Sequence, residues 1–366
     1  MGKICCYFND LALYRESIYR MMDAEYDIDW FIEDTDTQCK EFDPSLLKSV
    51  SHLHTVPLCH FYLTKGLISL LKKDYIIYFF LGSTRNITLY IFLIIKCLFY
   101  RKKKVYLWTH GYYGKESPMN LALLKRPMFK MCDGAFIYGD YAISLMTHDG
   151  LNGKKLWPIH NSLNYNVQLS LRNTVEYSNI YQEHFGNNDP VLIFLGRLTP
   201  VKKLDQAIEA VKILKDRGEN YNMVLIGDGP EGNSLRSLVK KFNLECCFWF
   251  YGACYDERIN AELVYNADLC LAPGNIGLTA IHALMFGCPA ATHNNFAYQM
   301  PEFEAIREGK TGIFFKQNDV LDIARAISEW FNLNHDKRGF VKEACYKEID
   351  DNWTPQYQMK ILKNVF

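Results

Sequence analysis

Short runs of β-branched and aromatic residues alternate with longer helical stretches along most of this 366-residue chain. The clearest example is the strand-like run Val191–Leu195, which is followed by the stretch Lys203–Asp216 and then by a second strand-like run, Asn222–Ile226. Strands that alternate with helices are typical of parallel sheets covered by helices. Ligands of such sheets bind beside the carboxyl ends of the strands. The pattern therefore predicts an α/β protein whose functional residues lie in strand-to-helix loops.

The length of the chain and one polar segment predict two domains. Chains of this size exceed the usual single domain, and the alternation stops between Asn161 and Asn188, where the residues become polar and lose their period. We expect an N-terminal Rossmann-like domain over 1–165, a linker over 166–188 and a second Rossmann-like domain over 189–345. Residues 346–366 are predicted to form a C-terminal helix that packs back towards the N-terminal domain.

The composition argues against several classes of function. Lys and Arg together number 41, as do Asp and Glu, so the net charge of zero gives no electrostatic basis for binding nucleic acid. The 12 cysteines include no C-x-x-C pair, and the start MGKICCYF leads directly into a strand-like run without the layout of a signal peptide. A reducing cytoplasm fits both observations. We expect no cofactor and no metal ion.

The segment from Asn86 to Tyr100 is almost wholly apolar and is followed by the basic run Arg101–Lys104. At about 15 residues, it is shorter than the roughly 20 that a membrane-spanning helix needs, and Lys96 interrupts it. Two interpretations stay open: a buried helix with a solvated basic loop, or a surface that also docks on anionic lipid. The expected location is the cytoplasm, with peripheral contact with the inner membrane under the second interpretation.

A loop with two cations follows the strand-like run Val191–Leu195. Arg197 and Lys202 lie in the segment GRLTPVK, which leaves the strand and enters a helix. Arginine can donate two parallel hydrogen bonds to phosphate oxygens, and lysine acts as a point charge, so the loop suits a diphosphate. On this segment alone, a solvated loop arginine and a helix-start lysine explain the pattern equally well.

Two further loops follow strands in the same way. Gly229 lies in the turn IGDGP, where glycine permits close approach to a ligand or to another loop. The segment PGNIGLTAIHAL turns and opens a helix near Gly277, whose free N–H groups favour an anion, and Thr279 could add a hydroxyl donor. His282 lies on one face of that helix with Leu278. A lone helical histidine is more often structural than functional.

The order of these elements resembles glycosyltransferase family 4, a retaining family with the GT-B fold. The resemblance covers about Val191 to Trp330 and rests on a series of short motifs at regular spacing. These are Gly196–Lys202, Gly227–Pro230, Gly252, Ala267–Asp268, the donor loop ending at Gly287–Pro289, Pro301–Glu302 and Gly309–Gly312. The resemblance implies two Rossmann-like domains whose parallel sheets face a central cleft, and it implies metal-independent transfer.

The resemblance also implies roles for individual residues in the C-terminal half. Arg197 and Lys202 would neutralise the donor diphosphate as the sugar leaves. The backbone amides of Gly277, Leu278 and Thr279 would hold its phosphates. The motif Gly227–Pro230 also marks Gly229 as a donor-binding residue.

The chain departs from the family pattern at two positions. In the family a glutamate, seven residues and a second glutamate span the donor loop and its helix, and here those positions are Gly274 and His282. Asn275 or a main-chain group is expected to replace the first carboxylate at the donor sugar. His282 is expected to take over the ribose contact, since a neutral imidazole donates one hydrogen bond and accepts one. With histidine at this position, the chain resembles a branch of the family that consists of bacterial surface-polysaccharide transferases.

Candidates in the N-terminal half are fewer. His110, at the carboxyl end of Val105–Thr109, resembles the family's N-lobe histidine near the donor sugar, and a loop histidine is the structural alternative. Glu116 is a weak candidate to orient or deprotonate an acceptor hydroxyl. Arg85, in the segment LGSTRN after a strand, is a second weak acceptor-side candidate.

Together these patterns predict a retaining enzyme that transfers a sugar from a nucleotide-diphosphate sugar, most simply a UDP-sugar. The predicted acceptor is a glycan or a polyprenyl-linked glycan in surface polysaccharide biosynthesis, such as capsule or O-antigen. Two alternatives stay open. One is a nucleotide-sugar 2-epimerase, which would need carboxylate acid and base groups. The other is a degenerate, non-catalytic nucleotide-sugar-binding subunit, because the motif glutamates are missing.

Overall fold

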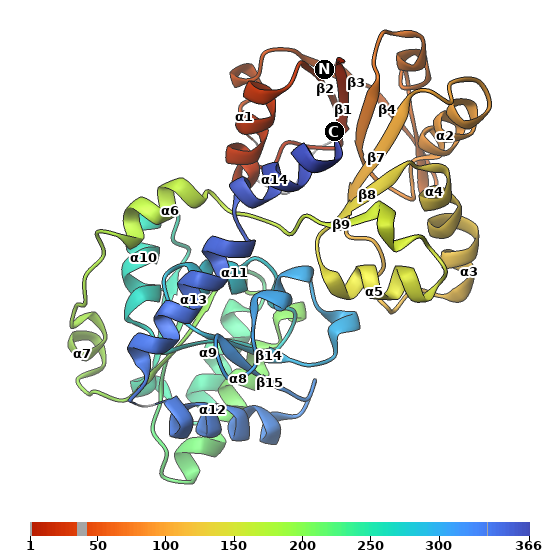
Figure 1. Cartoon of the computed structure of the whole chain (residues 1–366). Helices are drawn as coiled ribbons and strands as arrows, with labels where there is room; N and C mark the ends of the chain where they lie inside the picture. Colours follow the sequence, from red (N-terminus) through yellow and green to blue (C-terminus); the bar gives the residue numbers. More distant parts are fainter. Residues whose placement is uncertain (1, 35–41, 335) are drawn as a thin grey trace. The chain divides into compact units, whose positions relative to one another are not determined.

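The computed structural model describes residues 2–34, 42–334 and 336–366. The chain divides into two compact units, which we call unit 1 (Met1–Asn164 with Thr354–Phe366) and unit 2 (Tyr165–Trp353). Figure 1 labels their helices and strands. Each unit is built around a parallel sheet, as the alternation of strands and helices predicts.

Unit 1 contains a seven-stranded sheet in the order β3-β2-β1-β6-β7-β8-β9. Every neighbouring pair of strands in it is parallel. Its strands are β1 (Ile4–Phe8), β2 (Ile28–Glu33), β3 (Val50–Leu53), β6 (Ile77–Leu81), β7 (Lys104–Thr109), β8 (Gly134–Ile137) and β9 (Leu156–Pro158). A separate antiparallel hairpin joins β4 (Thr55–Leu58) to β5 (Phe61–Thr64).

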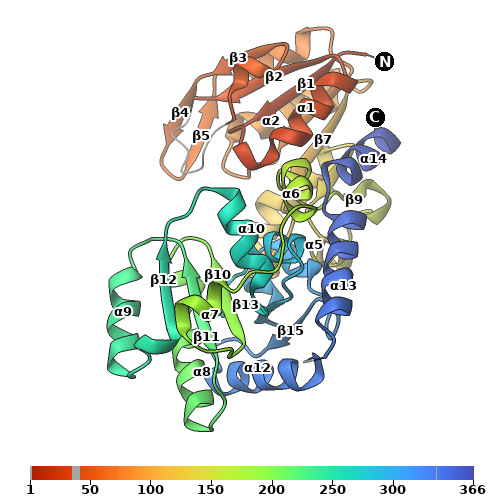
Figure 2. The same ribbon diagram turned by 90° about the vertical axis from the view of Figure 1, so that its left-hand side faces the viewer.

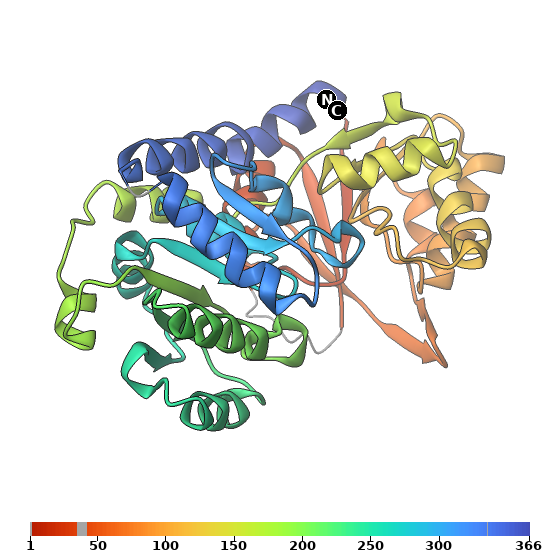
Figure 3. The ribbon, with the colours of Figure 1, turned by 90° about the horizontal axis from the view of Figure 1, so that it is seen from below.

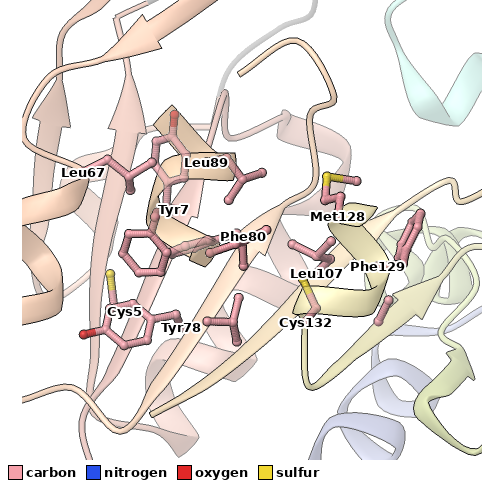
Figure 4. Close-up of a cluster of buried hydrophobic side chains, with 14 of the residues drawn as sticks. Cys5, Tyr7, Leu67, Tyr78, Phe80, Leu89, Leu107, Met128, Phe129 and Cys132 are labelled. Carbon is pink, nitrogen blue, oxygen red and sulfur yellow. The ribbon is translucent and has the colours of Figure 1, made fainter. Parts of the chain in front are cut away.

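Alternate residues of the unit 1 strands serve two hydrophobic cores, because successive side chains of a strand point to opposite faces. Cys5 and Tyr7 of β1 join one core, and Cys6 and Phe8 join the other. The first core, drawn in Figure 4, is packed by α2 (Ile87–Phe99), α4 (Arg126–Met131) and α5 (Asp140–His148). The second is packed by α1 (Glu16–Glu25) and α14 (Pro355–Val365). The short helix α3 (Pro118–Asn120) and a π-helical turn, η4 (Leu121–Lys125), precede α4.

Unit 2 contains a six-stranded parallel sheet in the order β12-β11-β10-β13-β14-β15. Its strands are β10 (Val191–Leu195), β11 (Asn222–Ile226), β12 (Phe248–Gly252), β13 (Leu269–Ala272), β14 (Ala290–His293) and β15 (Gly312–Phe315). Its helices are α6 (Tyr165–Arg172), α7 (Ile180–Phe185), α8 (Leu204–Asp216), α9 (Gly232–Lys241), α10 (Glu257–Asn266), α11 (Thr279–Met285), α12 (Val320–Asn334) and α13 (Arg338–Asn352). Helices α8 and α12 lie side by side (Figures 2 and 3).

The polar segment expected to be a linker over 166–188 is instead part of unit 2 and contains α6 and α7. Side-chain contacts hold it there: Arg172 pairs with Asp350, and the Tyr181 hydroxyl donates to the Leu263 carbonyl, both within unit 2. Polarity concealed these helices because they expose much of their surface. The interpretation of this segment as a linker was therefore wrong.

The C-terminal residues also divide differently from the expected boundary at 345. Helix α13 ends unit 2, and the chain returns to unit 1 only at Thr354. There α14 packs in the second core, where Met359 and Leu362 are buried and the Phe366 ring contacts Phe79 and Phe136.

The segment from Thr64 to Lys72 forms no α-helix. Its first residue ends strand β5, and only a 3₁₀ turn over Ile68–Lys72 follows. Gly66 lies between them with a φ of 85°, a left-handed conformation that interrupts a helix.

Candidate functional site

Two strand-to-helix loops of unit 2 meet at the point where its strand order reverses. The chain moves outwards from β10 to β11 and β12, and then returns to the other side of β10 with β13. The loops that follow β10 and β13 therefore leave neighbouring strands for opposite sides of the sheet. Such a switch point is the usual ligand site of an open parallel sheet. The sequence-predicted residues Arg197, Lys202 and Asn275 all lie in these two loops.

The loops approach each other so closely that side chains are excluded. A Cβ added to Gly274 would lie 1.9 Å from the Val201 carbonyl oxygen, and the Gly274 N–H donates to the Lys202 carbonyl over 2.9 Å. A third loop, after β11, comes similarly close to the loop after β10: a Cβ on its Gly229 would lie 2.4 Å from the Leu198 carbonyl oxygen. Contact between loops therefore explains why glycine occupies positions 274 and 229. It also explains why no carboxylate stands at position 274.

Lys202 connects the two loops. Its Nζ donates to the Asn275 carbonyl oxygen over 2.8 Å and to Asn275 Oδ1 over 2.9 Å. Burial lowers the pKa of Lys202, and attraction to Glu302 offsets this only in part. Both oxygens bonded to the ammonium are neutral, so its positive charge is not cancelled by direct pairing.

Arg197 lies on the same loop, and its side chain is exposed. In the part of the chain that the structure describes, neither Arg197 nor Lys202 has a carboxylate within ion-pairing distance. Other cations of unit 2, such as Arg172, Arg307 and Arg338, do have such partners. The switch point thus concentrates unpaired positive charge.

The loop after β13 adds hydrogen-bond donors. Across residues 2–34, 42–334 and 336–366, no acceptor is found for the backbone N–H groups of Gly277 and Leu278, which precede α11. Gln299 Oε1 accepts from the Ile276 N–H over 3.0 Å and fixes the loop. The Thr279 hydroxyl, predicted to serve a ligand, donates instead to the Leu195 carbonyl over 2.8 Å and ties α11 to β10. Two cations and two free amides suit an anion with several oxygens.

His282 faces a carboxylate that sequence reasoning missed. Its Nε2 lies 2.8 Å from Glu257 Oε1, at the start of α10, and only 12% of the His282 side chain is exposed. Glu257 also accepts a hydrogen bond from Gln168 Nε2 over 2.7 Å. Burial raises the pKa of Glu257, but the charge of His282 and these hydrogen bonds outweigh it, so the pKa lies below its usual value. Glu257 could have been noticed as the first helical residue after β12.

His110 lies in the loop after β7, where the sequence analysis places it. Its ring contacts Tyr138 edge-on at 4.7 Å between centroids and stacks on Tyr113 at 5.6 Å. Burial, together with the charges of Arg15 and Lys125, lowers the pKa of His110 to about 3. The imidazole is therefore neutral at physiological pH and can donate or accept a hydrogen bond, but it is no acid catalyst.

The two weaker candidates of unit 1 are engaged by the protein itself. Glu116 pairs with Lys125 and accepts the N–H groups of Tyr113 and Gly114, each over 2.8 Å. Burial raises the pKa of Glu116, but these partners outweigh it and hold the pKa below its usual range, so the carboxylate is a poor base. Arg85 Nε donates to the His60 carbonyl over 2.8 Å and braces the β4–β5 hairpin.

Comparison with protein families and curated proteins finds similarity to glycosyltransferases. Residues 178–347, most of unit 2, match the family described as glycosyl transferases group 1. The chain is 25% identical over 241 residues to "Putative glycosyltransferase EpsD" of Bacillus subtilis, which covers 63% of this chain and 61% of that protein. It is 29% identical over 173 residues to "Putative colanic acid biosynthesis glycosyltransferase WcaL" of Salmonella typhimurium, covering 45% and 42%. The chain thus matches less than two thirds of either relative's length.

Solved structures share the whole architecture. A structure of Anabaena HepE in complex with UDP matches with a TM-score of 0.71 at 15% identity, covering 99% of each chain. A glycosyltransferase from Rickettsia africae matches with a TM-score of 0.71 at 13% identity, covering 99% of this chain and 97% of that one. These likenesses, with the two parallel sheets, establish the predicted GT-B fold.

Proposed function

We propose that this chain is a glycosyltransferase that moves a sugar from a nucleotide-diphosphate sugar to a glycan acceptor. The observation that carries the proposal is the unpaired charge of Arg197 and Lys202 beside the free amides of Gly277 and Leu278, at the switch point of the unit 2 sheet. A diphosphate would be the anionic partner that these cations and amides lack in the protein itself. The family match over residues 178–347 supports the same assignment.

In the proposed reaction the cations act on the leaving group. As the bond between the sugar and the diphosphate breaks, negative charge grows on the departing phosphate oxygen. Preorganised donors aimed at that charge typically lower a barrier by about 3 kcal/mol each. Arg197 and Lys202 would supply this stabilisation without a divalent ion. Lys202 is held in place by Asn275 and is therefore preorganised.

We further propose that the sugar is transferred with retention. The acceptor hydroxyl would attack the anomeric carbon from the side of the leaving phosphate, whose oxygen would take the hydroxyl proton. No strong protein base is then needed, which fits the lowered pKa of His110 and the engaged carboxylate of Glu116. His110 would offer the donor sugar a neutral hydrogen-bonding group.

For the donor and acceptor we propose a UDP-sugar and a growing surface polysaccharide, on a lipid carrier at the cytoplasmic membrane face. Solved structures of HepE hold UDP and UDP-glucose, and WcaL is named for colanic acid biosynthesis. Glu257 is the first residue of α10 and His282 lies in the middle of α11, and these helices follow the carboxyl ends of β12 and β13. There they would meet the ribose hydroxyls of the nucleotide.

Thermal shift with nucleotides tests the donor site, because a ligand of the folded state raises the melting temperature. UDP, GDP and ADP, with matching nucleotide sugars, are titrated in the presence of EDTA. We expect a uridine species to raise the melting temperature of wild type and to do so weakly or not at all for Arg197→Ala. Equal shifts in both proteins would remove the phosphate assignment, and a shift that needs divalent metal would remove metal independence.

Turnover separates the proposal from its two alternatives. A transferase needs an acceptor, whereas a 2-epimerase converts the donor alone, so incubation with donor sugar and no acceptor distinguishes the two. A non-catalytic subunit would bind the donor and turn it over in neither case. Release of UDP that requires an acceptor and is lost in Arg197→Ala, with the variant still folded, is the result expected here.

A further inference from the structure

Helix α2 is apolar on both of its faces. Leu89, Phe92 and Leu93 point into the core of unit 1 and are fully buried, and Figure 4 shows Leu89 among those core side chains. On the outer face Ile91, Ile94 and Leu98 follow the i, i+3, i+7 spacing of a single helical stripe and are 39%, 48% and 58% exposed. A helix that only covered a sheet would carry polar residues there.

The exposed apolar residues continue beyond this stripe. Phe99, the last residue of α2, is 75% exposed, and Met119 and Leu123 in the α3–η4 segment are each 66% exposed. The Tyr90 hydroxyl donates to the Leu124 carbonyl over 3.3 Å, which joins α2 to η4. We call Ile91, Ile94, Leu98, Phe99, Met119 and Leu123, together with Arg101 and Lys102, the α2 surface.

The segment that carries this surface is strongly basic, although the whole chain is neutral. Residues 86–132 contain nine Lys and Arg residues but only one acid, Glu116. That acid is taken up by Lys125, while Lys96 and Lys104 pair with Asp133. Arg101, Lys102 and Lys130 are exposed, and none of them has an ion-pair partner anywhere in the described ranges.

We propose that the α2 surface docks unit 1 on an anionic lipid bilayer. The apolar stripe would enter the headgroup region, and Arg101 and Lys102, next to its end, would pair with lipid phosphates. None of the helices that the structure describes has the length and apolarity needed to cross a bilayer. The unpaired charges of Arg101, Lys102 and Lys130 are complementary to an anionic surface.

Flotation with vesicles tests the docking on the full chain. We expect the protein to float with vesicles of phosphatidylglycerol mixed with phosphatidylcholine and not with phosphatidylcholine alone, and to be released by high salt. Arg101→Gln with Lys102→Gln should weaken binding about 30-fold, since each basic residue near an anionic membrane contributes about 5-fold. Leu98→Ser with Phe99→Ser should abolish flotation even at low salt.

The matched control lies in unit 2, where Leu321 and Phe340 are 62% and 81% exposed and Arg338, close to Phe340 in the sequence, is paired with Asp268. Leu321→Ser with Phe340→Ser should float like wild type. Nucleotide thermal shift of every variant should equal that of wild type, so failure of docking and failure of the donor site give separate results. Equal binding to both vesicle types, or no effect of the α2 substitutions, would overturn the proposal. So would sedimentation showing that Leu98→Ser with Phe99→Ser turns a dimer into a monomer, because the surface would then be an interface between copies.

Discussion

The carboxyl edges of the two parallel sheets use their charged side chains in different ways. In unit 1 two of the cations in these loops are held by acids, Lys125 by Glu116 and Arg126 by Asp149, while Arg85 donates to a backbone carbonyl. In unit 2 the corresponding edge carries Arg197 and Lys202, and Lys202 is bonded only to neutral oxygens of Asn275. The two edges look alike in sequence, since each has basic residues in loops that follow apolar strands.

The difference shows that pairing, and not residue type, separates a structural charge from one available to a ligand. A cation satisfied by a carboxylate stabilises the fold and has little field left for a substrate. A cation that is held by neutral groups keeps its charge available to a ligand, although burial lowers its pKa. The charge of the proposed donor site is therefore in place in unit 2 before a ligand binds, while Glu116 and Arg85 of unit 1 bond to the protein itself.

Exchanging one lysine at each edge for methionine gives the largest expected effect. Lys202→Met should weaken binding of a nucleotide diphosphate about 100-fold, or about 2.7 kcal/mol, because the diphosphate loses a preorganised cation. The unfolding free energy of the Lys202→Met variant should not fall below that of wild type, since burial already disfavours the ammonium in the folded protein. Calorimetric titration and urea unfolding measure the two quantities.

Lys125→Met is the matched variant in unit 1. It should lower the unfolding free energy by about 2 kcal/mol, because Glu116 is left without its ion pair, and should leave nucleotide affinity unchanged. If the two variants behave alike in both measurements, the contrast between the edges is wrong.

A pair of glycines offers the next largest effect. Gly274→Ala should cost about 2 kcal/mol, because the added Cβ meets the backbone of Val201, which cannot move without separating the two loops of the donor site. In unit 1, Gly82→Ala meets only the end of the Leu107 side chain at 3.2 Å and should cost less than about 1 kcal/mol. Denaturant unfolding measures both, and only Gly274→Ala should also reduce the nucleotide thermal shift.

The sequence predicts β10 and β11 well because almost all of their residues are buried on both faces. The runs Val191–Leu195 and Asn222–Ile226 coincide with β10 and β11. The edge strand β3 and the strand β9 were not predicted, because β3 is short and half exposed and β9 has three residues and ends in proline. Burial on two faces leaves a continuous apolar run in the sequence, and an edge strand leaves none.

The candidate site, too, could be predicted only in part. The loops of Arg197 and Asn275 could be located, because both follow clear strands. The contact between Lys202 and Asn275, 73 positions apart, could not be read from the sequence, nor could that between His282 and Glu257. The reason for glycine at 274 also lies in another loop, which no local pattern reveals. The bond from the Thr279 hydroxyl to the Leu195 carbonyl could not be read from the sequence either, and the role expected of the Thr279 backbone amide stays a prediction.

Acid titration sharpens the comparison through two histidines, His110 in unit 1, which is half-buried, and His293 in unit 2, which is buried. The pKa of His110 is lowered to about 3 by burial and by Arg15 and Lys125, and that of His293 to about 4 by burial alone. An unfolded histidine titrates near 6.5, so the unfolded state takes up the proton first and stability falls as the pH falls below that value. At about pH 5.5 each histidine should cost about 1.4 kcal/mol relative to neutral pH.

His110→Asn and His293→Asn should each remove that part of the acid loss, as measured by urea unfolding at several pH values. The effect of His110 should also shrink as salt is added, because two cations contribute to it, whereas the effect of His293 should not. A salt response shared by both histidines would show that the positive field near His110 is not special to unit 1.

The smallest expected effect concerns Glu257, a carboxylate of unit 2 that, like Glu116, lies against a basic side chain and accepts a further hydrogen bond. Its pKa is below the ordinary 4.5, so it stabilises the fold above that pH, and this contribution is lost as the pH falls through its folded-state pKa. Glu257→Gln should therefore cost about 1 kcal/mol at neutral pH, because the carboxylate is partly exposed and its pairing with His282 is screened, and should cost little in acid.

Urea unfolding measures the stability of this variant, and thermal shift with UDP against 2′-deoxy-UDP measures whether Glu257 contacts the ribose. If Glu257→Gln lowers only stability, the carboxylate is a structural partner, as Glu116 is in unit 1. If it also removes the preference for the ribose hydroxyl, the donor site extends from the switch point to α10.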